Sequence, residues 1–123
     1  HWYNEGLLAS EKSGCLLRLG KPQEAAVSAN KGLAIFDESY VNNRAFCMLF
    51  LGNARLQSGE IDEAARVIRD AAGLAAQTRS ARLVRELRTT RAGMQPWQDT
   101  PAVKELDDQL FAYGLASSSA AYA

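Results

Sequence analysis

The sequence has one histidine, His1, and lacks the motifs on which most catalytic sites are built. One histidine is too few for a typical zinc site, and its place at the terminus does not suit a histidine-based catalytic triad. The glycines are scattered at turns and form neither a G-x-G-x-x-G nor a G-x-x-x-x-G-K-[ST] motif, so no phosphate-binding loop is expected. We therefore expect a protein that is not an enzyme and that binds no metal and no cofactor.

The chain also has few cysteines and no long apolar run. Cys15 and Cys47 each lie among apolar neighbours and do not form a C-x-x-C pair. Two cysteines are too few for a disulfide framework, so we expect both to be reduced core residues of an intracellular, cytoplasmic protein. No run approaches membrane-spanning length and no signal peptide is visible, so no membrane partner is expected.

An excess of either charge is missing as well. Fourteen basic residues balance fourteen acidic ones. A domain that binds DNA or RNA through phosphates usually carries a clear basic excess. We therefore expect no direct nucleic-acid contact from this segment.

Strand signals are weak, because β-branched residues are few and N-G hairpin turns are absent, whereas alanine-rich segments are common. Two segments repeat instead. Leu19–Phe36 aligns with Ser58–Ala75 without a gap, at a period of 39 residues, and Gly20 matches Gly59. A period in this range is typical of helical solenoids. The sequence therefore predicts an all-α fold.

Helical periodicity and capping residues set the expected elements. Gly20 and Gly59 suit the turns between paired helices, Pro22 suits the first turn of its helix, and Thr100-Pro101 is a capping pair. The six helices are expected at about 3–19, 22–36, 42–57, 61–76, 79–93 and 101–113.

These helices are expected to pair as antiparallel hairpins in one domain. The hairpins lie at about 3–36, 42–76 and 79–113, within a domain of residues 1–114. The remaining residues, 115–123, are expected to be a disordered tail.

The segment FLGNARLQSGEIDEAARVIRDAAGLA (Phe50–Ala75) resembles the tetratricopeptide repeat (TPR). Leu51-Gly52 stands on the first helix, Gly59 at the turn, and small or apolar residues follow on the second helix. In the first copy Lys12 stands at the usual leucine and Ser13 at the usual glycine, and 39 residues exceed the usual repeat of about 34. The resemblance implies a TPR-like α-solenoid of about three hairpins that binds a protein or peptide.

The C-terminal third carries a narrower resemblance. RSARLVRELRTTRAGMQPW followed by DTPAVKELDDQL is similar to the end of the repeat domain in actinobacterial (XRE-type) helix-turn-helix transcription regulators. This implies the ligand-sensing and dimerisation part of a bacterial regulator, whose DNA-binding part would lie upstream of His1. The alternative is a scaffold module that recruits a protein partner in an unrelated assembly.

A ligand face is expected on the helix at 42–57. At about 100° per residue, Cys47, Met48 and Leu51 fall on its buried side. The opposite side, which would face the groove of the solenoid, carries Phe46, Leu49, Phe50, Asn53 and Gln57.

Asn53 has a further role by the resemblance, in which an asparagine in its position bonds the backbone of an extended peptide. A carboxamide offers a donor and an acceptor to a peptide unit, and Phe46 and Phe50 would supply apolar pockets beside it. The alternative is that Asn53 faces water and both phenylalanines pack on an adjacent helix.

The segment RSARLVRELRTTR places arginines at every third position from Arg79 to Arg91. Each step of three residues turns about 300°, so the arginines wind around the helix and cannot form one nucleic-acid stripe. Arg82, Arg85 and Arg88 share the outer face. Arg82 and Arg85 would lie on the side of Asn53, where they could hold a ligand carboxylate. Otherwise they are solvated or pair with Glu86 and the acids near Asp107.

The two ends of the chain carry aromatic residues. Trp2 and Tyr3 begin the first helix, which suggests a missing upstream repeat or a self-association surface, such as a homodimer through terminal repeats. Trp97 is expected to fill a hairpin corner. The inner face of the last helix is expected to carry Val103, Leu106, Leu110 and Phe111.

Overall fold

The computed structural model describes residues 1–116, and these form six α-helices and one short 3₁₀ helix (η1), with no strand among them. The prediction of an all-α fold is confirmed. The helices are α1 (Trp2–Arg18), α2 (Pro22–Ile35), α3 (Val41–Gln57), α4 (Ile61–Ala75), α5 (Ala81–Ala92) and α6 (Pro101–Ala112), and η1 (Gln95–Trp97) lies between the last two.

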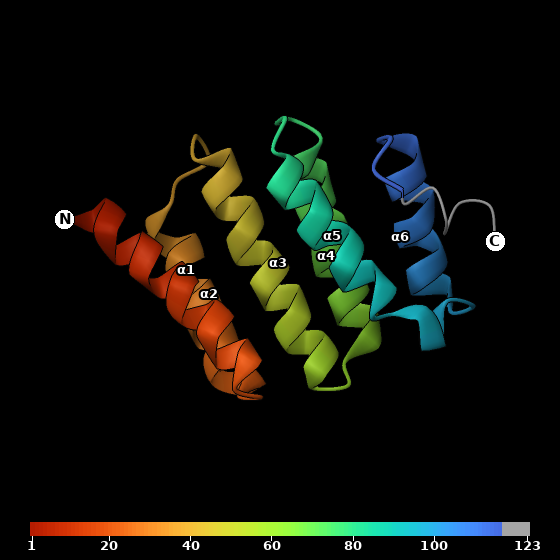
Figure 1. Ribbon diagram of the computed structural model, residues 1–123, viewed down its shortest axis with the longest axis horizontal. Helices are drawn as coiled ribbons and strands as arrows, with labels where there is room; N and C mark the ends of the chain where they lie inside the picture. Colours follow the sequence, from red (N-terminus) through yellow and green to blue (C-terminus); the bar gives the residue numbers. More distant parts are fainter. Residues whose placement is uncertain (117–123) are drawn as a thin grey trace.

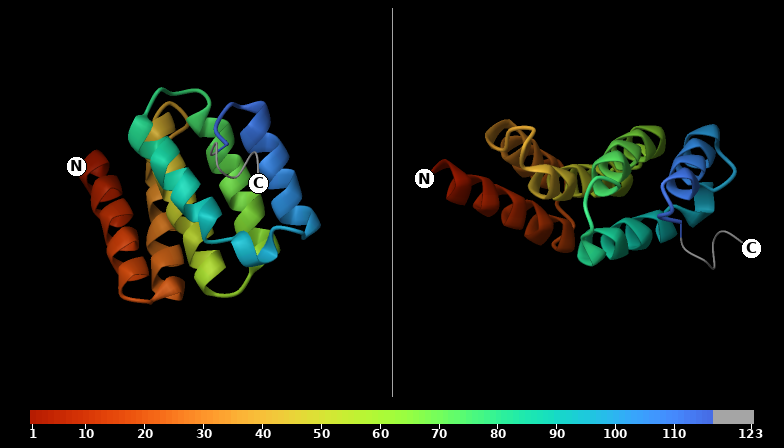
Figure 2. Two further views of the ribbon diagram at one scale, coloured as in Figure 1. Left: turned by 45° about the vertical axis from the view of Figure 1, so that its right-hand side comes forward. Right: turned by 90° about the horizontal axis from the view of Figure 1, so that it is seen from above.

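The helices lie side by side along the long axis of the molecule, with α1 and α2 at one end and α6 at the other (Figure 1). α1 packs against α2, α3 against α4, and α2 against α3. Seen from above, α1 and α5 lie on one side of the molecule, while α2, α4 and α6 lie on the other (Figure 2). α3 contacts α1, α2, α4 and α5 and is therefore the central helix.

The ends of α1 and α3 have the same backbone geometry, as the repeat predicts. Gly20 has φ 72° and Gly59 has φ 80°, in the left-handed region that favours glycine. The amides of Gly20 and Lys21 bond the carbonyls of Leu17 and Leu16, and the same pattern recurs around Gly59. Each turn is thus a Schellman motif, which satisfies carbonyls that would otherwise be left open at the helix end.

The starts of α5 and α6 are set by side-chain caps. Ser80 Oγ accepts the amide of Leu83 at 3.1 Å, and Thr100 Oγ1 accepts that of Val103 at 3.4 Å, with Pro101 as the first helical residue. These oxygens satisfy amides that have no partner within the helix. The start of α6 agrees with its prediction, whereas α5 begins at Ala81, two residues later than expected.

The two repeat copies fill the space between their paired helices differently. A Cβ on Gly52 of α3 would lie only 2.7 Å from Cγ1 of Ile68 on α4. In the first copy Ser13 stands at the position of Gly52 and Ala29 at that of Ile68. Ser13 is fully buried and donates its hydroxyl to Ala25 O at 2.7 Å. The first copy therefore combines a larger residue on its first helix (Ser13) with a smaller one on its second (Ala29), and the second copy does the reverse with Gly52 and Ile68. This exchange of sizes explains why the first copy departs from the repeat pattern.

The last two helices are joined differently from the earlier pairs. α6 packs on α4 and α5 packs on α3, while the connection through η1 carries the chain across between them. Val103, Leu106 and Leu110 are buried on the inner face of α6, as expected. The prediction for Phe111 is wrong, because it lies on the outer face and is 70% exposed.

The packed region continues beyond the predicted boundary at Gly114. Leu115 is buried in the main core cluster, and its carbonyl accepts from Arg88 Nε at 3.1 Å. The part of the predicted tail at 117–123 lies outside the described residues.

The aromatic residues at the start of α1 contact other aromatic rings of the molecule, but Trp2 remains 44% exposed. The Tyr3 ring lies 5.7 Å from those of Phe36 and Tyr40, and Trp2 meets Tyr40 edge-on at 5.2 Å. A Cβ on Gly6 would lie 2.6 Å from the Phe36 ring, so the small residue permits this packing. These contacts fix α1 to the connection between α2 and α3.

Candidate functional site

The predicted ligand-binding residues of α3 do not all lie on one open side. Leu49 is buried in the main core cluster, so its expected place on the ligand face is wrong. Cys47 is buried as predicted, but Met48 and Leu51 are only partly buried. A helix wheel assumes one buried side, whereas α3 has helices packed around most of its circumference.

Phe46 and Phe50 form a partly buried aromatic pair on α3, with ring centroids 6.4 Å apart. A Cβ on Gly14 of α1 would lie 3.4 Å from the Phe50 ring. From the other side, the guanidinium of Arg82 on α5 lies 4.7 Å from the centre of the Phe46 ring. This is a cation–π contact between α3 and α5. We call Phe46, Phe50, Asn53 and Arg82 the central face.

The Asn53 side chain bonds within the protein. Its Nδ2 donates to Leu49 O at 3.0 Å and to Thr90 Oγ1 on α5 at 2.9 Å. Both amide hydrogens are thereby used, which leaves the Oδ1 acceptor as the group that a ligand would meet. Asn53 therefore does not simply face water, and it joins α3 to α5.

Gln57, also expected to bind a ligand, is tied to α1. Its Nε2 donates to Leu17 O at 3.1 Å. That carbonyl belongs to the last turn of α1 and also accepts the amide of Gly20. Gln57 is exposed and also joins α3 to α1 through this bond.

The arginines of α5 have four different environments. Arg82 stacks on Phe46, Arg85 is exposed, and Arg88 donates to Leu115 O and Ala116 O. Arg91 is buried and bonds Asp107 on α6 through Nε and through Nη2, the latter at 2.9 Å.

The Arg91–Asp107 pair was not predicted, because the acids near Asp107 were considered only as partners of Arg82 and Arg85. Gln95 Oε1 also accepts from Arg91 Nη1 at 3.1 Å, so the guanidinium has partners on two sides. A bidentate pair of this kind fixes the orientation of its elements as well as their distance. Arg91 is therefore a structural link between α5 and α6.

The two cysteines have opposite environments. Cys47 is buried as predicted, and burial raises the pKa of its thiol above the usual value. The prediction that Cys15 is a core residue is wrong, because it is exposed. Its sulfur accepts from Arg18 Nη2 at 3.1 Å.

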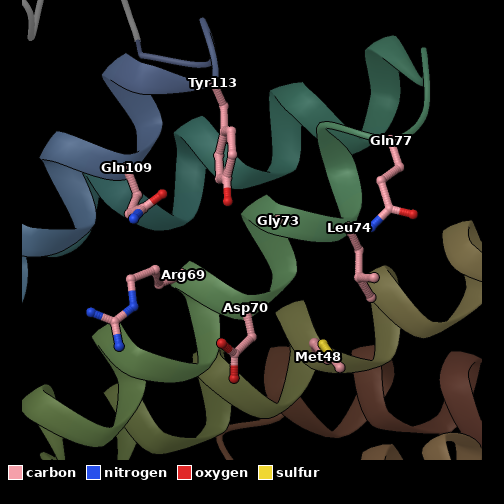
Figure 3. Close-up of a pocket in the computed structure, with 8 residues that line it drawn as sticks. All are labelled: Met48, Arg69, Asp70, Gly73, Leu74, Gln77, Gln109 and Tyr113. Carbon is pink, nitrogen blue, oxygen red and sulfur yellow. The ribbon is translucent and has the colours of Figure 1, made fainter.

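A cleft between α4 and α6 was not foreseen from the sequence (Figure 3). Its volume is about 470 Å³, and the phenol of Tyr113 points toward Gly73 across it. No spacing motif marks it, because its polar groups come from helices far apart in the sequence. The lining residues are Met48, Arg69, Asp70, Gly73, Leu74, Gln77, Gln109 and Tyr113.

Over residues 1–116, no group of His, Cys, Asp and Glu side chains has a geometry that would hold a metal ion. Nor does that part of the chain contain a helix with the length and apolar character needed to cross a membrane. No protein-family model, curated protein or solved structure matches this chain.

Proposed function

We propose that this chain is a TPR-like α-solenoid domain, without catalytic activity, that binds a protein or peptide segment on the central face. The 39-residue sequence repeat supports the solenoid, together with the shared glycine turns at Gly20 and Gly59. The pairing of α1 with α2 and of α3 with α4 supports it as well.

The observation that carries the binding proposal is the stacking of Arg82 on the partly buried Phe46–Phe50 pair. Aromatic side chains with an arginine are the residue types that contribute most to protein interfaces. The aromatic pair would take an apolar side chain of the ligand. Arg82, with the exposed Arg85 one turn along, would attract an acidic one.

In this proposal Asn53 acts through its Oδ1, which would accept an amide hydrogen from the ligand backbone. Its two donors stay on Leu49 and Thr90, so the carboxamide is already held in place before a ligand binds. A group that is ordered in advance loses less entropy on binding.

We further propose that the domain is the ligand-sensing and dimerisation part of a bacterial transcription regulator. Support comes from the similarity of Arg79–Trp97 and Asp99–Leu110 to such regulators. The alternative is a cytoplasmic scaffold module. The coding sequence next to this segment distinguishes them: a helix-turn-helix favours the regulator, and a catalytic or transport domain favours the scaffold.

Selection from a random peptide display library tests the binding proposal. We expect the recovered peptides to combine an apolar or aromatic residue with an acidic one. Arg82→Gln should weaken their binding by at least about fivefold. Arg66→Gln is the matched control, because Arg66 is exposed on α4 and pairs with Glu63 and Asp70.

Gln109→Ala tests the α4–α6 cleft as an alternative binding site. If it weakens binding while Arg82→Gln does not, the cleft is the binding site and the central-face proposal is wrong. If no peptide is recovered by the wild-type chain, peptide binding itself is rejected.

A further inference from the structure

An exposed apolar stripe runs along the side of α1 that faces away from α3. Leu8 is 66% exposed and Leu19 is 68% exposed, and Cys15 lies between them on the same side. Residues 8, 15 and 19 are spaced seven and four apart, which places them along one face of a helix. Apolar exposure of this extent on one face is typical of an interaction surface.

The sequence repeat shows what covers the equivalent stripe in the second copy. Leu8 matches Cys47, Lys12 matches Leu51 and Cys15 matches Ala54. In α3 these positions face α2: a Cβ on Gly32 would lie 2.6 Å from Cys47 Sγ, and Ala54 and Leu51 pack in the cluster that contains Ala25 and Ala26. A helix therefore covers in the second copy the surface that the first copy leaves open.

Beside the stripe lies a hollow of about 250 Å³ between α1 and α2. Lys12 and Lys31 line it, and neither forms an ion pair with another group in residues 1–116. Ser28 and one acid, Glu5, also line the hollow, so the two lysines leave it with an excess of one positive charge. The open side of α1 thus combines apolar residues with a net positive hollow, and it suits a helix that carries an acid beside an apolar residue.

The outer face of α6, at the other end of the molecule, carries that combination. Phe111 is 70% exposed, and Asp108 lies one turn before it and is exposed as well. Asp108 lies opposite the inner residues Val103, Leu106 and Leu110, and Phe111 lies at the edge of the exposed face.

The directions of the helices match too. In Figure 1, α1 runs downward and α6 runs upward, at opposite ends of the long axis. A second copy shifted along this axis would place its α6 antiparallel to α1, as α2 is to α3. In that arrangement Phe111 meets Leu8 while Asp108 meets Lys12. The two contacts fit together because Asp108 and Phe111 lie one turn apart on α6, as Leu8 and Lys12 do on α1.

From these observations we infer that copies of this chain associate head to tail. The outer face of α6 in one copy packs on the open side of α1 in the next, with Phe111 against Leu8 and Asp108 between Lys12 and Lys31. The contact joins two different surfaces, so each added copy leaves one end free and the chain of copies can grow. This inference does not depend on ligand binding at the central face.

Sedimentation velocity of the full chain over a wide concentration range tests the inference. We expect the average mass to rise above the 13.4 kDa of one chain as concentration increases, and to fall again when salt is added, because the ionic part of the contact is screened. Leu8→Ser and Phe111→Ser should each weaken association by at least about tenfold. Arg66→Ser is the control, because Arg66 is exposed on α4, which belongs to neither surface of the contact.

Mixing the two disabled variants is the decisive step. The Leu8→Ser chain keeps an intact α6 and the Phe111→Ser chain keeps an intact α1, so together they should form a one-to-one dimer that grows no further. Lys12→Glu mixed with Asp108→Lys should also restore association, and this mixture should grow beyond a dimer, because opposite charges then meet at both kinds of junction.

A wild-type chain that stays monomeric at every concentration would overturn the inference and leave the α1 stripe to a helix of a different protein. Self-association that persists in both Leu8→Ser and Phe111→Ser would overturn it as well. So would a mixture of the two that shows no dimer.

Discussion

Asn53 on α3 donates its side-chain amide to the hydroxyl of Thr90 on α5 at 2.9 Å, across 37 residues of sequence. Both residues are at least partly buried, so the bond is shielded from water. α5 has no extensive backbone packing on α6, and it is held to the rest of the molecule by α3, α4 and a few polar contacts. The Asn53–Thr90 bond is therefore expected to position α5, and with it Arg82.

We expect Asn53→Ala to lower the free energy of unfolding by about 1–2 kcal/mol, because Thr90 Oγ1 loses its donor in a buried position. Thr90→Val should cost a similar amount, and the double variant should cost less than the sum of the two. Urea unfolding measures all three. Thr89→Val is the control, because Thr89 is exposed and bonds only its own helix, so its effect should stay within about 0.5 kcal/mol. Full additivity of Asn53→Ala and Thr90→Val would show that the bond contributes nothing.

The packing of the second repeat predicts a compensating pair of substitutions. Gly52→Ser should destabilise the protein by about 1–3 kcal/mol, since the new side chain overlaps Ile68. Ile68→Ala alone should cost about 2–5 kcal/mol by leaving a cavity. The double variant reproduces the Ser13 and Ala29 arrangement of the first copy and should be more stable than additivity predicts by at least about 1 kcal/mol. A double variant no more stable than the sum would contradict our explanation of the two copies.

The Arg91–Asp107 pair is expected to hold α6 beside α5. Asp107→Asn removes the charge that Arg91 faces and should cost about 1–3 kcal/mol, because Arg91 is buried. Hydrogen exchange should then speed up in α5 and α6 more than in α1. Glu86→Gln, exposed on α5, is the control and should change neither exchange nor stability. Uniform loss of protection along the chain would mean that the pair has no local role.

Thiol labelling at neutral pH should modify one cysteine per native chain. Cys15 is exposed, whereas Cys47 is buried and its raised pKa keeps it protonated. The second thiol should react only after unfolding. Rapid labelling of both thiols in the native protein would place Cys47 outside the core.

The sequence predicted the helices well, because their ends depend on local signals. Gly20, Gly59 and Thr100 act on the turn next to them, and the structure places helix ends at each, whereas the cap at Ser80 was missed and α5 was expected two residues too early. It predicted side-chain directions less well. Leu49 was placed on the ligand face because a helix wheel has one buried side.

Contacts between distant segments could not be derived from periodicity. The partners of Arg91 and Asn53 lie 16 and 37 residues away, and the spacing of residues along one helix says nothing about them. The same reason explains why the α4–α6 cleft was missed and why Phe111 was expected inside. An apolar residue at the edge of a helix face is assigned to the core by pattern alone, but α4 covers only part of that face.

Amide chemical-shift mapping by NMR tests most directly whether the central face binds a ligand. The chain would be titrated with a peptide recovered from the display selection. We predict that the largest shifts fall on Phe46, Phe50, Asn53 and Arg82, and that Arg82→Gln reduces them at the same peptide concentration. Shifts confined to Gly73, Gln109 and Tyr113 in the α4–α6 cleft, with the central face unchanged, would contradict this account.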